Sequence, residues 1–309
     1  MASKFILFFL LLFGICSAQD VLIISEEKNI TPLIDGTLII PETSVKLPLV
    51  IIIQGSGPID RNGNQFMQKN NSLRFLSEGL YTNGIASFRY DKRIVKLLRR
   101  GTLIEKDIKF GDYIADAISV IDYFKEDERF SKIIIIGHSQ GSLVGMIAAQ
   151  GRADKFISLA GVGQEIDYVI LDQLAIQVPG LKDNARQAFD DLRINGVAIN
   201  YSPGLASIFR PAIQQFLLEW MQYNPQVEIV KLDMPVLIIN GDRDIQVQVS
   251  EAEKLKAAKP DAQYVIIPFM NHIFKKIKGD DLVNSKSYNE YNRPVMPELI
   301  EIISGFIQQ

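Results

Sequence analysis

Consecutive apolar residues form short runs along this chain, and these runs predict strands that are buried on both faces. β-Branched residues dominate several of them, which is typical of the inner strands of a parallel sheet. The clearest runs are residues 47–53, 85–90, 133–136, 155–160, 235–240 and 263–267. Between them lie segments of helical periodicity, such as 107–124, where apolar residues recur every three or four positions. This alternation predicts an α/β fold around a mostly parallel sheet.

The alternation stops between residues 163 and 228, where the pattern is helical throughout. Three helical patterns follow one another directly, and prolines and glycines separate them. They lie around residues 166–176, 184–194 and 206–223. The segment 163–228 therefore predicts a helical insertion between two parts of one α/β unit, residues 19–162 and 229–309.

The first 18 residues have the pattern of a signal peptide. A lysine is followed by the apolar run 5–13, which is too short to span a bilayer, and small residues then predict cleavage after Ala18. Lipid attachment at Cys16 is the alternative, but Ile15 stands where a small residue would be expected. We therefore expect an exported protein, periplasmic or secreted, with no stable membrane anchor. Cleavage would remove Cys16, the single cysteine, and with it any disulfide.

Composition narrows the function classes. The chain has 309 residues, of which 47% are hydrophobic, so one or two domains with a large core are expected. Charged residues make up 22%, and the formal net charge is −3. This balance gives no electrostatic reason to expect binding to nucleic acid or to an anionic membrane surface.

The isoleucine run at 133–136 leads into a motif that carries candidate chemistry. Gly-His-Ser-Gln-Gly occupies residues 137–141, and an apolar helical pattern follows. A Gly-x-Ser-x-Gly motif between a strand and a helix predicts a nucleophile elbow, in which Ser139 is strained and its Oγ is lifted clear of the sheet. Gly137 and Gly141 would avoid steric clashes in so tight a turn. The alternative is an ordinary strand-to-helix turn that contains a glycine-flanked serine.

With its elbow, the chain resembles the α/β-hydrolase superfamily, and three further segments carry the resemblance. These are Gln-Gly-Ser-Gly-Pro at 54–58, Asn-Gly-Asp-Arg-Asp at 240–244 and Met-Asn-His at 270–272. Their order resembles the superfamily's order of oxyanion loop, nucleophile, acid and base. The similarity covers roughly residues 35–308 and is greatest to exported bacterial esterase-like members with a Gly-Ser-Gly-Pro-x-Asp-Arg loop. It implies an α/β-hydrolase fold with residues 163–228 as a helical cap after the sixth core strand.

The resemblance implies a Ser-His-Asp triad. Ser139 would be the nucleophile and His272, after the last core strand, the base. The other histidine, His138, precedes the nucleophile, so its side chain should point away from the Oγ direction. Asp244 has the Gly-x-x-Asp spacing expected of the acid, and Asp242 is its competitor.

The resemblance also implies an oxyanion hole made of the backbone N–H groups of Ser56 and Gln140. The alternative for the first of these is a plain turn rich in glycine and proline within residues 54–64. Asp60 and Arg61 are expected to pair with each other and to brace this loop.

We expect neither a metal nor a cofactor, because the sequence has no histidine pair on a helix, no phosphate-binding glycine loop and no cysteine after cleavage. The predicted function is that of a carboxylesterase acting on small or medium acyl esters through an acyl-enzyme. Peptidase, thioesterase and amidase activities of the same fold are alternatives, and a non-catalytic binding module is a third class. The expected partner is thus a small-molecule ester, and the oligomeric state stays open.

Overall fold

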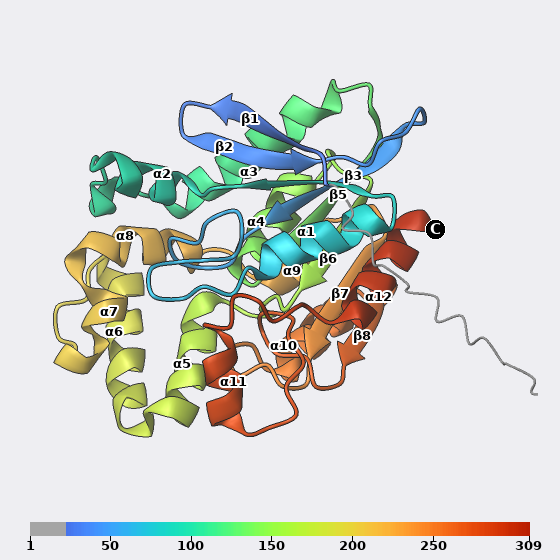
Figure 1. Cartoon of the computed structure of the whole chain (residues 1–309). Helices are drawn as coiled ribbons and strands as arrows, with labels where there is room; N and C mark the ends of the chain where they lie inside the picture. Colours follow the sequence, from blue (N-terminus) through green and yellow to red (C-terminus); the bar gives the residue numbers. More distant parts are fainter. Residues whose placement is uncertain (1–22) are drawn as a thin grey trace, which may run out of the picture.

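The computed structural model describes residues 23–309, so the predicted signal peptide lies outside the described residues. An eight-stranded sheet with the order β1-β2-β4-β3-β5-β6-β7-β8 forms its centre (Figure 1). The strands are β1 (Ser25–Thr31), β2 (Ile34–Ile39), β3 (Leu47–Ile53), β4 (Ala86–Tyr90), β5 (Phe130–His138), β6 (Lys155–Leu159), β7 (Val236–Gly241) and β8 (Gln263–Ile267). β3 to β8 run parallel to one another, whereas β1 and β2 pair antiparallel at one edge.

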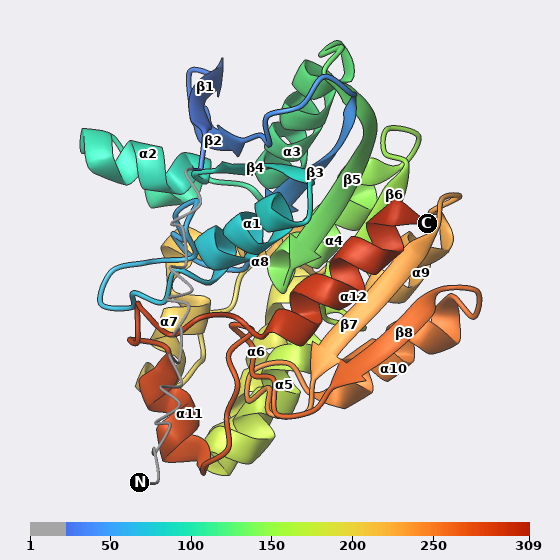
Figure 2. The same cartoon turned by 45° about the vertical axis from the view of Figure 1, so that its right-hand side comes forward.

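Helices cover both faces of this sheet (Figure 2). On one face lie α1 (Ser72–Thr82) and α12 (Pro297–Gln308), and on the other lie α3 (Phe110–Lys125), α4 (Gln140–Ala149), α9 (Pro225–Val230) and α10 (Val249–Ala258). Strand β5 shows how the two cores form. Ile134 and Ile136 pack toward α1 and α12, whereas Ile133 and Ile135 pack toward α3 and α4. These alternating contacts confirm the predicted α/β sheet with covered faces.

The insertion between β6 and β7 is helical. It contains α5 (Ile166–Gln177), η2 (Pro179–Leu181), α6 (Lys182–Asn195), η3 (Pro203–Leu205), α7 (Ala206–Phe209) and α8 (Pro211–Trp220). Figure 1 shows α6 and α7 standing well away from the sheet. Helix α9 instead packs against α4 and α10 in the layer that covers the sheet, so the boundary expected at residue 228 falls inside a core helix.

The remaining helices follow the ends of strands. α2 (Arg93–Arg100) comes after β4, η1 (Glu105–Asp107) precedes α3, and α11 (Asp281–Ser287) lies between β8 and α12. Because β3 to β8 are parallel, the loops after them meet at one edge of the sheet. No helix within residues 23–309 is both long enough and apolar enough to cross a membrane.

Candidate active site

Ser139 occupies the turn between β5 and α4. Its backbone is left-handed, with φ 54° and ψ −121°, a conformation that costs free energy in a residue with a side chain. The N–H of Ser139 donates to the carbonyl of Leu159 on β6 at 3.0 Å, which fixes the strained turn to the neighbouring strand. The sequence motif thus has the geometry of a nucleophile elbow.

The two glycines of the elbow make room in different directions. A Cβ on Gly137 would collide with the backbone of Gly141 and Ser142 across the turn, as the motif predicts. A Cβ on Gly141 would instead collide with the carbonyl groups of Ile53 and Gln54. Gly141 is therefore required for close approach to the end of β3 and the loop after it, rather than for the turn itself.

His272 and Asp244 are in direct contact. The Nδ1 atom of His272 lies 2.7 Å from Oδ2 of Asp244, and both side chains are buried. The other carboxylate oxygen, Oδ1, accepts the N–H groups of Gln246 and Val247, each at 2.8 Å. Three bonds hold the carboxylate, so it can fix the imidazole in one tautomer, with the proton on Nδ1 and Nε2 free to accept.

The turn that carries His272 is braced by its neighbour Asn271, which is fully buried. The Asn271 amide donates to Oδ1 of Asn284 and Oγ of Ser287, both at 2.9 Å, and both acceptors belong to α11. Its Oδ1 accepts the N–H of Lys275 at 2.9 Å. The α11 segment therefore positions the predicted base.

Ser139 and His272 line the same cavity of about 220 Å³, together with Ser56, Gln246 and Tyr288. In the described residues no hydrogen bond joins Oγ of Ser139 to the imidazole of His272. Such bonds are often long in unliganded hydrolases and tighten when substrate binds. The structure thus places Ser139 and His272 around one cavity, and Asp244 contacts His272 from outside its lining.

The loop after β3 lies against the nucleophile. A Cβ added to Gly55 would lie 3.2 Å from Cβ of Ser139 and 3.6 Å from its Oγ, so the N–H of the next residue, Ser56, is close to the reacting position. Gln140 begins α4, and the first N–H groups of a helix have no partner within it. These are the two donors that the sequence predicts for an oxyanion hole.

His138 is closer to the site than the sequence indicates. Its ring centroid lies 4.7 Å from that of His272, and its Nε2 donates to the backbone carbonyl of His272 at 3.0 Å. Burial, together with the neighbouring imidazole, holds the pKa of His138 well below its usual value, so this side chain is neutral. His138 thus supports the base through its backbone.

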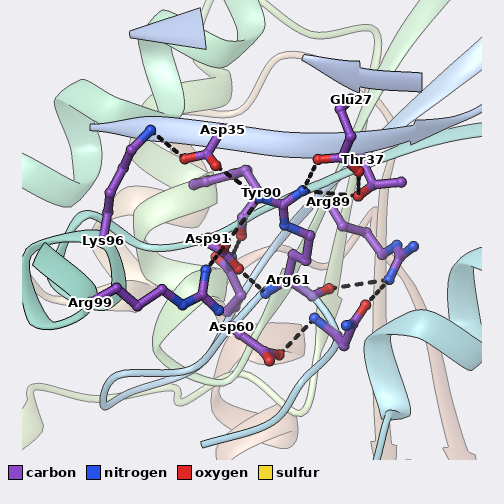
Figure 3. Close-up of polar contacts among 12 residues, drawn as sticks. Glu27, Asp35, Thr37, Asp60, Arg61, Arg89, Tyr90, Asp91, Lys96 and Arg99 are labelled. Carbon is purple, nitrogen blue, oxygen red and sulfur yellow. Dashed lines mark hydrogen bonds and ion pairs between the residues drawn. The ribbon is translucent and has the colours of Figure 1, made fainter. Parts of the chain in front are cut away.

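The expected pair between Asp60 and Arg61 is wrong. Asp60 accepts the N–H groups of Asn62 and Asn64 and closes its own loop. The Arg61 guanidinium instead binds carboxylates outside this loop, namely Glu27, Asp35 at 3.2 Å and Asp91 at 3.0 Å (Figure 3). Lys96 and Arg99 add ion pairs to Asp35 and Asp91, both at 2.6 Å. Arg61 therefore pairs with three carboxylates from β1, β2 and the end of β4, and not with Asp60, its neighbour in sequence.

A second cavity, of about 330 Å³, shares Ser56 with the first and also has Gln140 in its wall. Its walls are mainly apolar and come from the start of α3 and from α8 of the insertion, and they include Tyr113, Ile213, Phe216 and Trp220. Trp220 also stacks on Phe110 of α3, and Phe216 meets the same ring edge-on. The aromatic residues of α8 therefore both pack the insertion onto the core and line a cavity.

A further cavity, of about 430 Å³, lies between α5 and α10 and is lined by Asp244, and neither Ser139 nor His272 lines it. Within residues 23–309 no three side chains of His, Cys, Asp or Glu gather in a way that could hold a metal ion.

Sequence reasoning missed two site residues. Asn271 was seen only as part of the Met-Asn-His segment, although its bonds to α11 define the turn. Lys92 follows β4 and looks like an ordinary polar residue in the sequence, yet it is buried against the oxyanion loop. A lysine two residues after the end of a buried strand, next to Asp91, was the available signal.

No protein-family model matches this sequence. Esterase EstD of Thermotoga maritima is 28% identical over 263 residues, which are 82% of this chain and 61% of that protein, so the chain spans less than two thirds of the length of this relative. Among solved structures, Est1E from Butyrivibrio proteoclasticus aligns with a TM-score of 0.56 and 18% identity, over 86% of this chain and 96% of its own. An esterase from Pyrococcus furiosus aligns with a TM-score of 0.54 and 14% identity, over 93% and 90%.

Structural likeness at this level of identity establishes the fold, and the sequence relative covers most of the chain. The strand order, the strained serine after β5 and the histidine–aspartate contact after β8 and β7 are the features that the resemblance implied. The chain has the α/β-hydrolase fold and is similar in sequence to an esterase.

Proposed function

We propose that the protein is a serine carboxylesterase that cleaves small or medium acyl esters through an acyl-enzyme intermediate. The observation that carries this proposal is the 2.7 Å contact between His272 and Asp244 beside a cavity shared with the strained Ser139. The sequence relative and both structural neighbours are called esterases or carry an esterase name, which supports the same class.

In the proposed reaction, Oγ of Ser139 attacks the ester carbonyl while Nε2 of His272 takes the hydroxyl proton. Asp244 keeps the imidazole oriented and stabilises the imidazolium. The N–H groups of Ser56 and Gln140 stabilise the negative charge on the carbonyl oxygen. His272 then gives its proton to the leaving alcohol, and a water molecule releases the acid from Ser139 by the same steps.

The two cavities beside Ser56 suggest how an ester would lie. The leaving oxygen must reach His272, which protonates it, so the alcohol would occupy the cavity of about 220 Å³ that His272 lines. The acyl group would extend past Ser56 and Gln140 into the apolar cavity of about 330 Å³. A volume of this size suits a small or medium acyl group.

The alternatives use the same residues. A peptidase, thioesterase or amidase would differ in the leaving group, and fold alone does not choose between them. A non-catalytic binding module is a weaker candidate, because a strained serine and a buried histidine–aspartate pair cost stability that binding alone does not require.

Two measurements test the proposal. A fluorophosphonate probe should label the wild-type protein and not Ser139→Ala, whereas Ser119→Ala, a serine bonded within α3, should label normally. p-Nitrophenyl esters of increasing acyl length should then be hydrolysed faster than aminoacyl-naphthylamides. If the naphthylamides were cleaved faster, the protein would be a peptidase and not an esterase. If the probe did not label the wild-type protein, the non-catalytic binding module would be favoured.

Export after cleavage at Ala18 is a separate proposal, supported by the apolar run 5–13 and the small residues that follow it. The intact mass of protein recovered from the periplasm or medium should correspond to a chain that starts at Gln19. A mass that retains residue 1, or that includes lipid on Cys16, would contradict this proposal.

A further inference from the structure

A buried lysine lies behind the loop that carries Ser56. Lys92 follows β4, and its side chain is almost completely shielded from solvent. Its Nζ donates to the carbonyl of Gly55 at 2.7 Å, to that of Gly57 at 3.3 Å and to Oε1 of Gln140 at 2.9 Å. An ammonium group has three N–H donors and no acceptor, so these partners use all of its donors.

The three partners of Lys92 belong to the two halves of the predicted oxyanion hole. Gly55 and Gly57 flank Ser56 on either side, and Gln140 supplies the second N–H. The loop and the start of α4 come from distant parts of the chain, after β3 and after β5. One ammonium therefore fixes the position of both donors relative to each other.

The surroundings of Lys92 leave its charge without a neutralising partner. No carboxylate of the described residues forms an ion pair with it, and its Nζ lies over the ring of Tyr113, 4.4 Å from the centroid. A void of about 10 Å³ beside it is lined by Gln54 and Asp116 as well as Tyr113. Oε1 of Gln54 is buried there without a partner in the described residues. The site thus places the amino group of Lys92, without a carboxylate partner, behind the loop at which negative charge would develop.

We propose that Lys92 is a positioning residue that locks the two N–H donors of the oxyanion hole, at Ser56 and Gln140, into one geometry. This inference rests on the proposed serine-hydrolase function. A residue that holds transition-state donors should affect kcat far more than KM, because the substrate carbonyl needs these donors most when it becomes an oxyanion.

The chain offers a matched control. Lys155 is also a buried lysine whose Nζ donates to two carbonyl groups, those of Phe306 at 2.7 Å and Ile307 at 3.3 Å, and lies 5.0 Å from an aromatic ring. These contacts lie at the end of α12, away from the site. Lys155→Met therefore reproduces the loss of a buried, carbonyl-bound ammonium without touching the oxyanion loop.

The test compares Lys92→Met with Lys155→Met on p-nitrophenyl butyrate, with rates normalised to the sites that a fluorophosphonate probe labels to completion. Lys92→Met should lower kcat on the order of 10- to 100-fold and leave KM within about twofold, because misplacing donors costs less than deleting one outright. Lys155→Met should keep the wild-type kcat per labelled site. Affinity for phenylboronic acid, whose tetrahedral adduct occupies the oxyanion hole, should fall in parallel with kcat in Lys92→Met alone.

Equal kcat per labelled site in Lys92→Met and wild type would overturn the inference while the esterase function stands. A wild-type protein that neither reacts with the probe nor hydrolyses esters would remove both. If Lys92→Met does not fold, Gln140→Leu decides, since it removes one acceptor of Lys92 and keeps the backbone N–H. A lower kcat with unchanged KM supports the positioning role, and unchanged kcat contradicts it.

Discussion

Asp242 and Asp244 stand two residues apart but hold different parts of the same base loop. Oδ1 of Asp242 accepts the backbone N–H of Phe269 at 2.6 Å, whereas Oδ2 of Asp244 contacts the imidazole of His272 at 2.7 Å. Asp242 is exposed and Asp244 is buried. Asp244 is therefore placed to act on the proton of His272, and Asp242 is placed to support the loop backbone.

This division predicts unequal effects on catalysis. Ser139→Ala and His272→Ala should each lower kcat/KM on the order of 10⁴-fold or more, and the double variant should be scarcely worse than either single one. Asp244→Ala should lower it less, because the base remains but loses its orientation. Asp242→Ala should cost only a few-fold, on the order of one lost hydrogen bond.

Steady-state kinetics on the best p-nitrophenyl ester, with folded protein checked by circular dichroism, measures these effects. A larger loss in Asp242→Ala than in Asp244→Ala would transfer the role of the acid to Asp242. Full activity in Ser139→Ala would remove the serine mechanism altogether.

The proposed acyl cavity predicts a change in chain-length preference. Ile213→Trp should fill much of the cavity of about 330 Å³ and lower kcat/KM for p-nitrophenyl butyrate at least tenfold relative to p-nitrophenyl acetate. Ile199→Trp, at an exposed position of the same helical insertion, is the control and should leave the ratio unchanged. An equal loss on both esters in Ile213→Trp would place the acyl group elsewhere.

The ion pairs of Arg61 predict that the stability of the fold decreases at low pH. Burial raises the pKa of the Asp91 carboxyl, but hydrogen bonds from Arg61 and Arg99 outweigh it, so the pKa lies below its usual value. A carboxyl with a lowered folded pKa stabilises the protein above about pH 4 and loses this contribution as the pH falls through the folded pKa. Arg61→Met leaves Asp91 buried with a weaker partner.

We therefore expect Arg61→Met to lower the free energy of unfolding by about 3–5 kcal/mol at pH 7 and to move the acid-unfolding midpoint to higher pH. Urea titrations at several pH values measure both. Arg152→Met removes a surface arginine 3.7 Å from Asp122 and should change stability by less than about 1 kcal/mol. If both substitutions lowered the free energy of unfolding equally, the ion pairs around Arg61 would stabilise the protein no more than one surface ion pair.

The burial of Lys92 predicts how stability changes at alkaline pH. Burial lowers the pKa of its ammonium from 10.5 to about 7. Between these values the unfolded chain binds more protons than the folded protein, so the contribution of Lys92 to stability rises with pH across this window. Tyr90, Tyr113 and Asp116 face the same void, and burial raises the pKa of each.

Because these neighbours are present in both proteins, their titration largely cancels in a comparison with Lys92→Met. The difference in free energy of unfolding, wild type minus Lys92→Met, should become more favourable to the wild type as the pH rises from about 7 to 10. A difference that stays constant with pH would show that Lys92 keeps an ordinary pKa in the folded state.

The sequence predicted those parts of the site that depend on chain order. The isoleucine run of β5, the motif around Ser139 and the positions of Asp244 and His272 after later strands are local signals, and parallel strands bring their ends together. The inner strands were predicted well because their residues are apolar on both faces. Strand β1 was missed, since its residues are mostly polar and half exposed at the edge of the sheet.

Contacts between distant segments could not be predicted from these local signals. Arg61 binds Asp91 rather than Asp60 because antiparallel pairing of β2 with β4 gathers carboxylates beside it, and this register is not visible in the loop itself. The three acceptors of Lys92 come from the loop after β3 and the start of α4, which are adjacent only in the folded chain. Pairing of β3 with β5 creates that adjacency.

The hydrogen bonds from Asn271 to α11 bear on when, during synthesis or refolding, the active site is complete. Synthesis delivers the elbow and the oxyanion loop long before Asn284 and Ser287, which fix the turn of His272. In a growing chain, Ser139 can therefore be in place before His272 is held in position. Ester hydrolysis would begin only after the last helical segments have docked. The time at which hydrolysis starts during refolding would therefore report when the C-terminal part of the chain packs onto the rest.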